Sequence, residues 1–255
     1  MSDRDERDSL WPSVLACYDL SLEKTSDNLA LDEALLAAVE ADERHACLRF
    51  WDPADYCVVV GRSNNIETEV NVAACAADRI PIFRRASGGG TVMIGPGCLC
   101  YSLALPMNES LRALGVSKVT DQLMWRSATA LNSVLTQVEV CGTSDLVING
   151  VKFSGNAQRR LQRSLIQHGT LLFDFDLTLI DRYLTHPSSE PGYRNSRPHF
   201  EFVRNVALES QQLKSLLCSA WNAIPAECPE NIRLDAVSIA AARYGSAEWQ
   251  VPISS

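Results

Sequence analysis

With 255 residues, of which 46% are hydrophobic, the chain can bury one large core, and we expect a single compact domain. Its formal net charge of -8 argues against an extended basic surface for nucleic acid. The first residues lack the basic and apolar regions of a secretory signal, and no apolar run is long enough to cross a bilayer. We therefore expect a cytoplasmic protein with no membrane or nucleic-acid partner.

Cysteine and histidine spacing gives no metal or disulfide pattern. The nine cysteines include no CxxC pair, and the four histidines show no ligand spacing. We expect reduced thiols that act as small core residues. Cys98 and Cys100 occupy alternate positions of an expected strand, so they share one face and are expected to be buried.

The first half of the chain predicts short strands mixed with helices. Residues 1–13 are polar and predict a flexible tail. The leucine spacing predicts an amphipathic helix over 27–43, with Ser26 or Asp27 as its N-cap. Further along, we expect strands over 45–52, 56–63 and 81–85, and a helix over 69–79.

The second half continues with several strands in succession. We expect a buried strand over 98–106, a helix over 119–137, and strands over 138–142, 144–150, 151–160 and 168–176. This order favours an α+β fold, with mixed or antiparallel sheets flanked by helices, over a doubly wound nucleotide fold. Residues 185–199 predict a long surface loop, and two helices are expected over 211–224 and 233–249.

Three consecutive glycines, Gly88 to Gly90, follow Arg84 and Arg85. Glycine backbone beside a guanidinium can cradle a phosphate, because bare peptide N–H groups approach the oxyanion closely. The same pattern is also typical of a bulged turn. Neither the P-loop spacing nor the dinucleotide-binding fingerprint is present.

Lys152 lies in an expected strand between Gly150 and Gly155, with Asp145 upstream and Arg159 downstream. A lysine on a strand is usually solvated. In this company, however, the basic groups could neutralise a polyphosphate and the carboxylate could hold a divalent cation, as phosphoryl chemistry requires.

Taken in order, the segments RRASGGGTV, NGVKFSGNAQRR and QHGTLL resemble the lipoate–protein ligase family, in the group that also holds biotin ligases and octanoyltransferases. The segments ALDEALL and VVVGRSNNIETEVN support the resemblance, which runs from about Leu29 to about Asp176. It implies the biotin/lipoate protein ligase catalytic fold over residues 14–205, with a helical segment over 206–255 packed on it. No separate accessory domain is expected within the chain, which leaves room for a separate accessory subunit.

The resemblance also implies the activity. Members of the family make lipoyl-AMP from lipoate and ATP with Mg²⁺, and then pass the lipoyl group to a lysine of an acceptor protein. The acceptors expected for this chain are lipoyl domains such as those of the 2-oxoacid dehydrogenase E2 component or the glycine cleavage H protein.

Site residues follow from the matched motifs. Lys152 matches the family's essential lysine, beside the lipoate carboxyl and the α-phosphate, where charge develops. The nucleotide and its phosphates would be held by Arg85, Gly88, Gly89, Gly90, Thr91, Val92, Met93 and Lys152. The lipoate pocket would be formed by Arg62, Ser87, Gly155, His168 and Gly169. Asp145 is a candidate for metal or acceptor contact, although Thr143 and Ser144 replace the family's Arg and Asn.

Two alternatives stay open. The run Ile94 to Gly97 replaces the His-Asp pair common in ligases and is similar to the octanoyltransferase branch, which transfers octanoyl or lipoyl from an acylated carrier without ATP. A cysteine-dependent transferase needs an activated thiolate; Cys141 is the nearest thiol to the expected position, and we interpret it as structural. The other alternative is a catalytically silent lipoyl-binding relative. Lipoate and octanoate are not distinguished, because one apolar pocket can hold both.

Overall fold

The structure is a computed structural model that describes residues 10–244, 246 and 249. Within these residues the larger sheet has eight strands, in the order β11 (Ala223–Pro225), β1 (Leu15–Asp19), β2 (Cys47–Trp51), β6 (Cys98–Pro106), β10 (Ser164–Leu172), β9 (Val151–Arg160), β8 (Asp145–Ile148) and β7 (Val138–Cys141). The first three of these strands pair in parallel, and every pair from β2 to β7 is antiparallel. The sheet is therefore mixed, as the sequence predicts.

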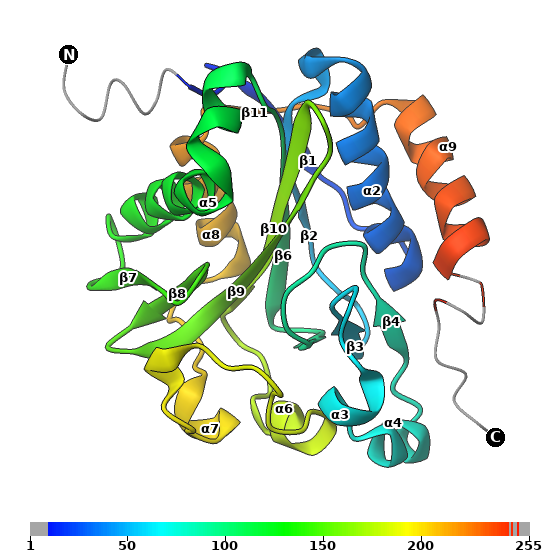
Figure 1. Ribbon diagram of the computed structural model, residues 1–255, viewed down its shortest axis with the longest axis vertical. Coiled ribbons are helices and arrows are strands. Elements are labelled where there is room, and N and C mark those ends of the chain that lie inside the picture. Colours follow the sequence, from blue (N-terminus) through cyan, green and yellow to red (C-terminus); the bar gives the residue numbers. More distant parts are fainter. Residues whose placement is uncertain (1–9, 245, 247–248, 250–255) are drawn as a thin grey trace.

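A second sheet of three strands has the order β4 (Ile82–Arg84), β3 (Cys57–Val60) and β5 (Val92–Ile94). In Figure 1 it lies beside one end of the large sheet. Short helices surround that end, namely α3 (Ile66–Glu69), α4 (Val72–Asp78), α6 (Thr178–Tyr183) and α7 (His199–Phe202). The expected strands over 45–52 and 56–63 are thus present, but they belong to different sheets.

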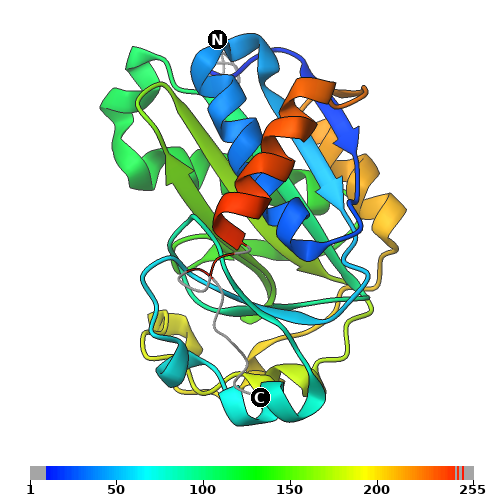
Figure 2. The same cartoon turned by 90° about the vertical axis from the view of Figure 1, so that its right-hand side faces the viewer.

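Long helices cover both faces of the large sheet. One face carries α2 (Thr25–Ala41) and α9 (Glu230–Ile239), which lie side by side in Figures 1 and 2. The other face carries α5 (Glu109–Leu131) and α8 (Ser210–Ala220). Three short helical turns complete the described elements: Glu43–His45, Gly192–Arg194 and Ala240–Tyr244. Among the described residues, no helix combines the length and the hydropathy needed to cross a membrane.

Strand β6 lies at the centre of the large sheet, and its sequence is one apolar run because both of its faces are buried. Leu99 and Leu103 pack into the core under α5 and α8, whereas Cys100 and Ala104 pack into the core under α2 and α9. A strand with both faces covered by helices needs no polar face. Cys98 and Cys100 are 1% and 5% exposed, so the prediction of burial is confirmed.

Several element boundaries differ from the predicted ones. The helix expected from residue 27 begins at Thr25, and the N-cap prediction is wrong: the N-cap is Lys24, without a side-chain cap. The Asn28 side chain fixes this entry instead, by donating to the carbonyls of Leu22 and Lys24 and accepting from the Leu22 N–H. The helix expected over 69–79 is two short helices, α3 and α4.

Elements were also missed or shortened. Strands β1, β5 and β11 were not predicted, because their residues show little of the alternation that marks a half-buried strand. The strand expected from residue 168 begins at Ser164, and the helix expected over 211–224 ends at Ala220. The last expected helix continues as far as Tyr244; residues 245, 247 and 248, like residues 1–9, lie outside the described part.

Candidate active site

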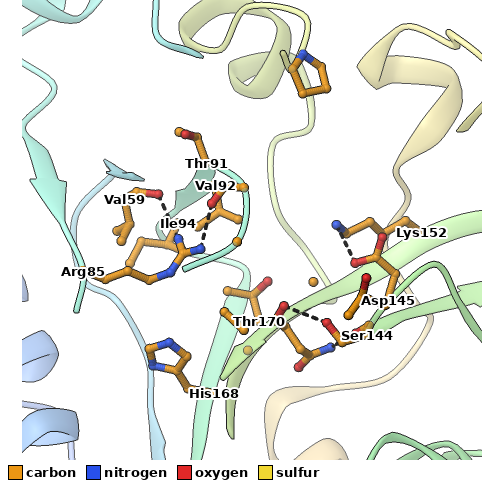
Figure 3. A pocket seen from close by; sticks show the side chains of 18 of the residues that line it. Val59, Arg85, Thr91, Val92, Ile94, Ser144, Asp145, Lys152, His168 and Thr170 are labelled. Atoms are coloured by element: carbon orange, nitrogen blue, oxygen red, sulfur yellow. Dashed lines mark hydrogen bonds and ion pairs between the residues drawn. The ribbon is translucent and has the colours of Figure 1, made fainter. Parts of the chain in front are cut away.

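A cavity of about 390 Å³ is lined by residues of both sheets and of α2. Figure 3 shows Arg85 and Val92 on one side and Lys152 and Asp145 on the other. Of the residues that the sequence selected, those that line the cavity are Arg85, Gly89, Gly90, Thr91, Val92, Asp145, Lys152, Gly155, His168 and Gly169. The fold therefore brings together motifs that lie far apart along the chain.

The remaining selected residues do not line this cavity. Arg62 is exposed at the start of the β3–α3 connection, and Met93 is buried in the core. Gly88 lies in the same connection as Gly89 but outside the lining. Ser87 is also outside the lining, and it is linked to the cavity wall through a hydrogen bond to His168.

The glycine cluster forms the connection between β4 and β5. These strands flank β3, so the connection must cross the end of β3. A Cβ atom on Gly61, just after β3, would overlap the carbonyl oxygen of Gly89, and Gly89 itself has a φ of 85°. Close approach and a left-handed backbone therefore require glycine at these two positions. A Cβ atom on Gly88 or on Gly90 would meet no other atom within 4 Å. Because glycine has no side chain, the backbone at these two positions is left uncovered.

Arg85 holds this connection in shape. It is 7% exposed, and its Nη2 donates to the carbonyl oxygens of Gly88 and Gly90 at 2.6 and 2.8 Å. Because N–H and C=O point in opposite directions across a trans peptide, the following N–H groups, of Gly89 and Thr91, point away from Arg85. Burial lowers the pKa of Arg85 to about 10, so it remains charged at neutral pH.

Arg85 is in turn fixed by a chain of buried and partly buried contacts, which we call the Asp32 relay. It joins Arg49, Asp32, His168, Ser87 and Arg85. Arg85 Nε lies 3.0 Å from Ser87 Oγ, Ser87 Oγ lies 2.6 Å from His168 Nε2, and His168 Nδ1 lies 2.9 Å from Asp32 Oδ2. Since Ser87 accepts from Arg85, its hydroxyl can donate to His168 Nε2, which places the ring proton on Nδ1 toward Asp32.

The far end of the Asp32 relay is a buried ion pair. Asp32 Oδ1 lies 3.0 Å from Arg49 Nη1, and Arg49 is 0% exposed. Burial opposes ionisation of Asp32, but the hydrogen bond from His168 and the charge of Arg49 outweigh it, so the net effect lowers the pKa of Asp32. Asp32 was not selected from the sequence. Its position in ALDEALL predicted only a helix.

Lys152 faces the glycine connection from β9. Its Nζ lies 2.8 Å from Asp145 Oδ1, and the Tyr193 hydroxyl donates to Asp145 Oδ2 at 2.7 Å. Both oxygens of Asp145 are therefore engaged by the protein. No group of three or more His, Cys, Asp or Glu side chains placed to hold a metal ion occurs among the described residues. Asp145 thus orients Lys152, and a contact of Asp145 with a metal ion or with the acceptor stays a prediction.

Two further glycines make room beside Lys152. A Cβ on Gly155 would lie 2.9 Å from Lys152 Nζ, and a Cβ on Gly169 would overlap the Asn156 side chain. Asn156 donates to the carbonyl of Ser144 at 2.6 Å and accepts from the Tyr101 hydroxyl at 2.5 Å. His168 and Gly169 lie inside β10, paired with β6 and β9, whereas the sequence predicts a strand that begins at His168.

The expected surface loop over 185–199 covers part of the cavity. Pro187, Ser189, Glu190, Pro191, Arg194 and His199 contribute to its lining. Tyr193 links this segment to Asp145. Sequence reasoning treated the segment as a loop without a functional role, because its Pro and Ser content signals only a lack of regular structure.

The comparison with protein families assigns the chain. The sequence model of the lipoyl protein ligase A/B catalytic domain matches residues 24–214. The chain belongs to this family. The matched range includes every residue that lines the cavity, from Leu29 to Phe202. The resemblance of the sequence motifs to lipoate ligases is confirmed.

Relatives of the lipoyl protein ligase family agree with this assignment. A probable lipoate-protein ligase A of Mycoplasma pneumoniae is 37% identical over 157 residues, which cover 62% of this chain and 45% of that protein. This chain thus matches less than half of its relative's length.

Solved structures of the same family share the fold. A lipoate-protein ligase A bound with ATP has a TM-score of 0.79 at 19% identity, and the alignment covers 92% of this chain and 97% of the other. A bi-partite lipoate protein ligase of Thermoplasma acidophilum, studied with its E2 lipoyl domain, has a TM-score of 0.79 at 18% identity, over 94% of this chain and 97% of the other. The predicted α+β ligase fold is confirmed.

Proposed function

We propose that this chain is a lipoate–protein ligase that activates lipoate with ATP to lipoyl-AMP and transfers the lipoyl group to a lysine of an acceptor protein. The observation that supports it most is the position of Lys152. This cation faces the glycine connection across one cavity, in a chain that belongs to the lipoyl protein ligase family. The transferase and the silent relative do not require a site for the phosphates of ATP.

The reaction has two steps. A lipoate carboxylate oxygen attacks the α-phosphorus of ATP, the bond from that phosphorus to the β-bridging oxygen breaks, and pyrophosphate leaves. The acceptor lysine amine then attacks the acyl carbon, loses a proton, and AMP leaves. Negative charge grows on phosphate oxygens in the first step and on the acyl oxygen in the second. The Lys152 ammonium would stabilise both of these charges, because Asp145 already orients it.

The other predicted residues have distinct roles in this proposal. Gly89, Gly90, Thr91 and Val92 form the nucleotide-facing wall, with the N–H groups of Gly89 and Thr91 turned away from Arg85. Arg85 acts chiefly by shaping that wall, since four of its five N–H groups donate to Ser87, Val59, Gly88 and Gly90. His168 orients Arg85 through Ser87. Mg²⁺ would come with the ATP phosphates, whose oxygens are its preferred ligands.

The acceptor and the extent of the catalytic unit are also proposed. The family's bi-partite member studied with an E2 lipoyl domain supports a lipoyl domain as acceptor, of the kind carried by E2 or H proteins, and supports a separate accessory subunit. We propose residues 14–205 as the catalytic domain, with the segment over 206–255 packed on it. Its described part supplies β11 to the large sheet and packs α9 against α2.

Thiol chemistry does not support the transferase alternative. Cys141 lies on β7 outside the cavity lining, and burial, together with the charges of Glu139 and Asp145, raises its pKa. Cys100 does line the cavity, but burial raises its pKa well above the usual value. A thiol nucleophile needs the opposite shift.

The deciding experiment incubates the purified protein with ATP, Mg²⁺ and lipoate and measures pyrophosphate. We expect lipoate-dependent release, and Cys141→Ala should release it at the same rate. Octanoyl transfer from an acylated carrier without ATP, lost in Cys141→Ala, would overturn the ligase. Lipoate binding without either reaction would indicate the silent relative.

A further inference from the structure

One cation of the cavity wall lacks a full set of partners. Arg194 lines the cavity and is 3% exposed, and its Nη2 has no hydrogen-bond partner among the described residues. A buried donor without a partner is costly, and native structures rarely keep one without a reason. A ligand that displaces the atoms now covering Nη2 is one such reason.

The rest of the Arg194 side chain is firmly held. Its Nε donates to the carbonyl of Arg197 at 2.9 Å and lies 3.4 Å from Glu190 Oε2. Its guanidinium carbon lies 4.6 Å from the centre of the Phe202 ring. Burial lowers the pKa of Arg194, but an arginine stays charged at neutral pH. The group is therefore a fixed charge with a spare donor.

The three strong cations of the cavity lining are Arg85, Lys152 and Arg194. Arg194 is paired with Glu190 and Lys152 with Asp145, whereas Arg85 Nη2 already donates to two backbone carbonyls. ATP carries several phosphate charges, and Lys152 can serve those beside the α-phosphate. The two outer phosphates need a second cation, and a planar guanidinium suits phosphate oxygens. Thr91 Oγ1, also on the cavity lining, is likewise without a hydrogen-bond partner in the described part of the chain.

We propose that Arg194 binds the β- and γ-phosphates of ATP, and hence the pyrophosphate that leaves. This inference rests on the proposed ligase function. It gives the segment over 185–199 a part in the reaction. The segment carries the cation for the leaving group, and Tyr193, the neighbouring residue, holds Asp145 beside Lys152.

The test titrates inorganic pyrophosphate into the full-length protein by calorimetry. Arg194→Gln should bind pyrophosphate roughly ten- to a hundredfold more weakly than the wild type, the usual effect of losing a hydrogen bond to a charged group. The matched control is Arg182→Gln. Arg182 lies on α6, outside the cavity lining, and pairs with Asp78 instead of with any contact of Arg194. Its affinity for pyrophosphate should be unchanged.

Two outcomes would overturn the inference: unchanged affinity in folded Arg194→Gln, or an equal loss in both variants. If Arg194→Gln does not fold, Arg194→Lys is measured instead. It keeps the charge without the planar fork, and wild-type affinity there would count against a guanidinium contact.

Kinetics separate this inference from the ligase proposal. Arg194→Gln should raise KM for ATP and leave KM for lipoate unchanged. Lipoate-dependent pyrophosphate release by the wild type, with no change of pyrophosphate affinity in the variant, would overturn the role of Arg194 alone. Pyrophosphate binding that depends on Arg194, without any release from ATP, would overturn the ligase alone.

Discussion

Asp32 Oδ2 on α2 lies 2.9 Å from His168 Nδ1 on β10, and this contact ties the glycine connection to the core. The first prediction concerns Arg49, which pairs with the other carboxylate oxygen of Asp32. In Asp32→Asn the buried Arg49 loses its carboxylate, so we expect a loss of about 3–5 kcal/mol in the free energy of unfolding, measured in urea. Asp19→Asn is the control, because Asp19 pairs with Lys214 at the surface, with a side chain 53% exposed. Its loss should be about 0–1 kcal/mol, and equal losses would contradict a special role for Asp32.

The same carboxylate predicts a pH dependence of stability. The net effect on Asp32 lowers its pKa in the folded protein. A group of this kind contributes its full stabilisation above the unfolded pKa, about 3.9 for Asp, and loses it as the pH falls through the lower folded value. Stability measured from pH 5 downward should therefore fall more steeply for the wild type than for Asp32→Asn. Parallel curves would show that folding does not lower the pKa of Asp32.

Lys152 is predicted to act in catalysis and not in folding. Lys152→Ala should lower the rate of lipoyl-AMP formation by roughly 10²- to 10³-fold, as loss of one preorganised charge contact typically does. Thermal unfolding should change far less than the rate, because Asp145 keeps the hydrogen bond from the Tyr193 hydroxyl when the ammonium is removed. Lys118→Ala, an exposed lysine on α5, is the control and should keep full activity. If Lys152→Ala keeps the wild-type rate, Lys152 has no role in the mechanism.

Gly61 is predicted to be indispensable although it lies outside the triple-glycine motif. The Cβ of Gly61→Ala would overlap the Gly89 carbonyl, and backbone cannot move aside as a flexible side chain can. We expect a loss of about 1–3 kcal/mol in the free energy of unfolding, the usual cost of overpacking. Gly88→Ala should change stability far less, because its Cβ would meet nothing within 4 Å. The reverse order of the two variants would show that the crossing of β3 is not as close as described.

Much of the fold was predictable because its signals are local. The helix α2 and the strands β2, β3, β6 and β9 follow from residue spacing and composition within one short window. The edge strand β11 and its neighbour β1 were missed because their pairing joins residues more than 200 positions apart, Leu15 with Ala223, and a short window holds no trace of it.

The site was predictable in part. The glycine cluster, Lys152 and His168 stand out as unusual residues within ordinary elements. Asp32 and Arg194 do not: an acidic residue on an amphipathic helix and an arginine in a loop are usually solvated. Only their burial, at 5% and 3% exposure, marks them as exceptions.

The sequence by itself determined the family, the types of element and the residues that carry charge and backbone freedom, because motif order and periodicity are properties of the chain. Tertiary structure alone decided how these residues act. It turned Arg85 toward the carbonyls of Gly88 and Gly90, joined His168 to Asp32 and Ser87, and buried Arg194 in the cavity wall. The physical reason is that burial and hydrogen-bond partners arise only when distant segments pack together, and these set the charge state and orientation of each group.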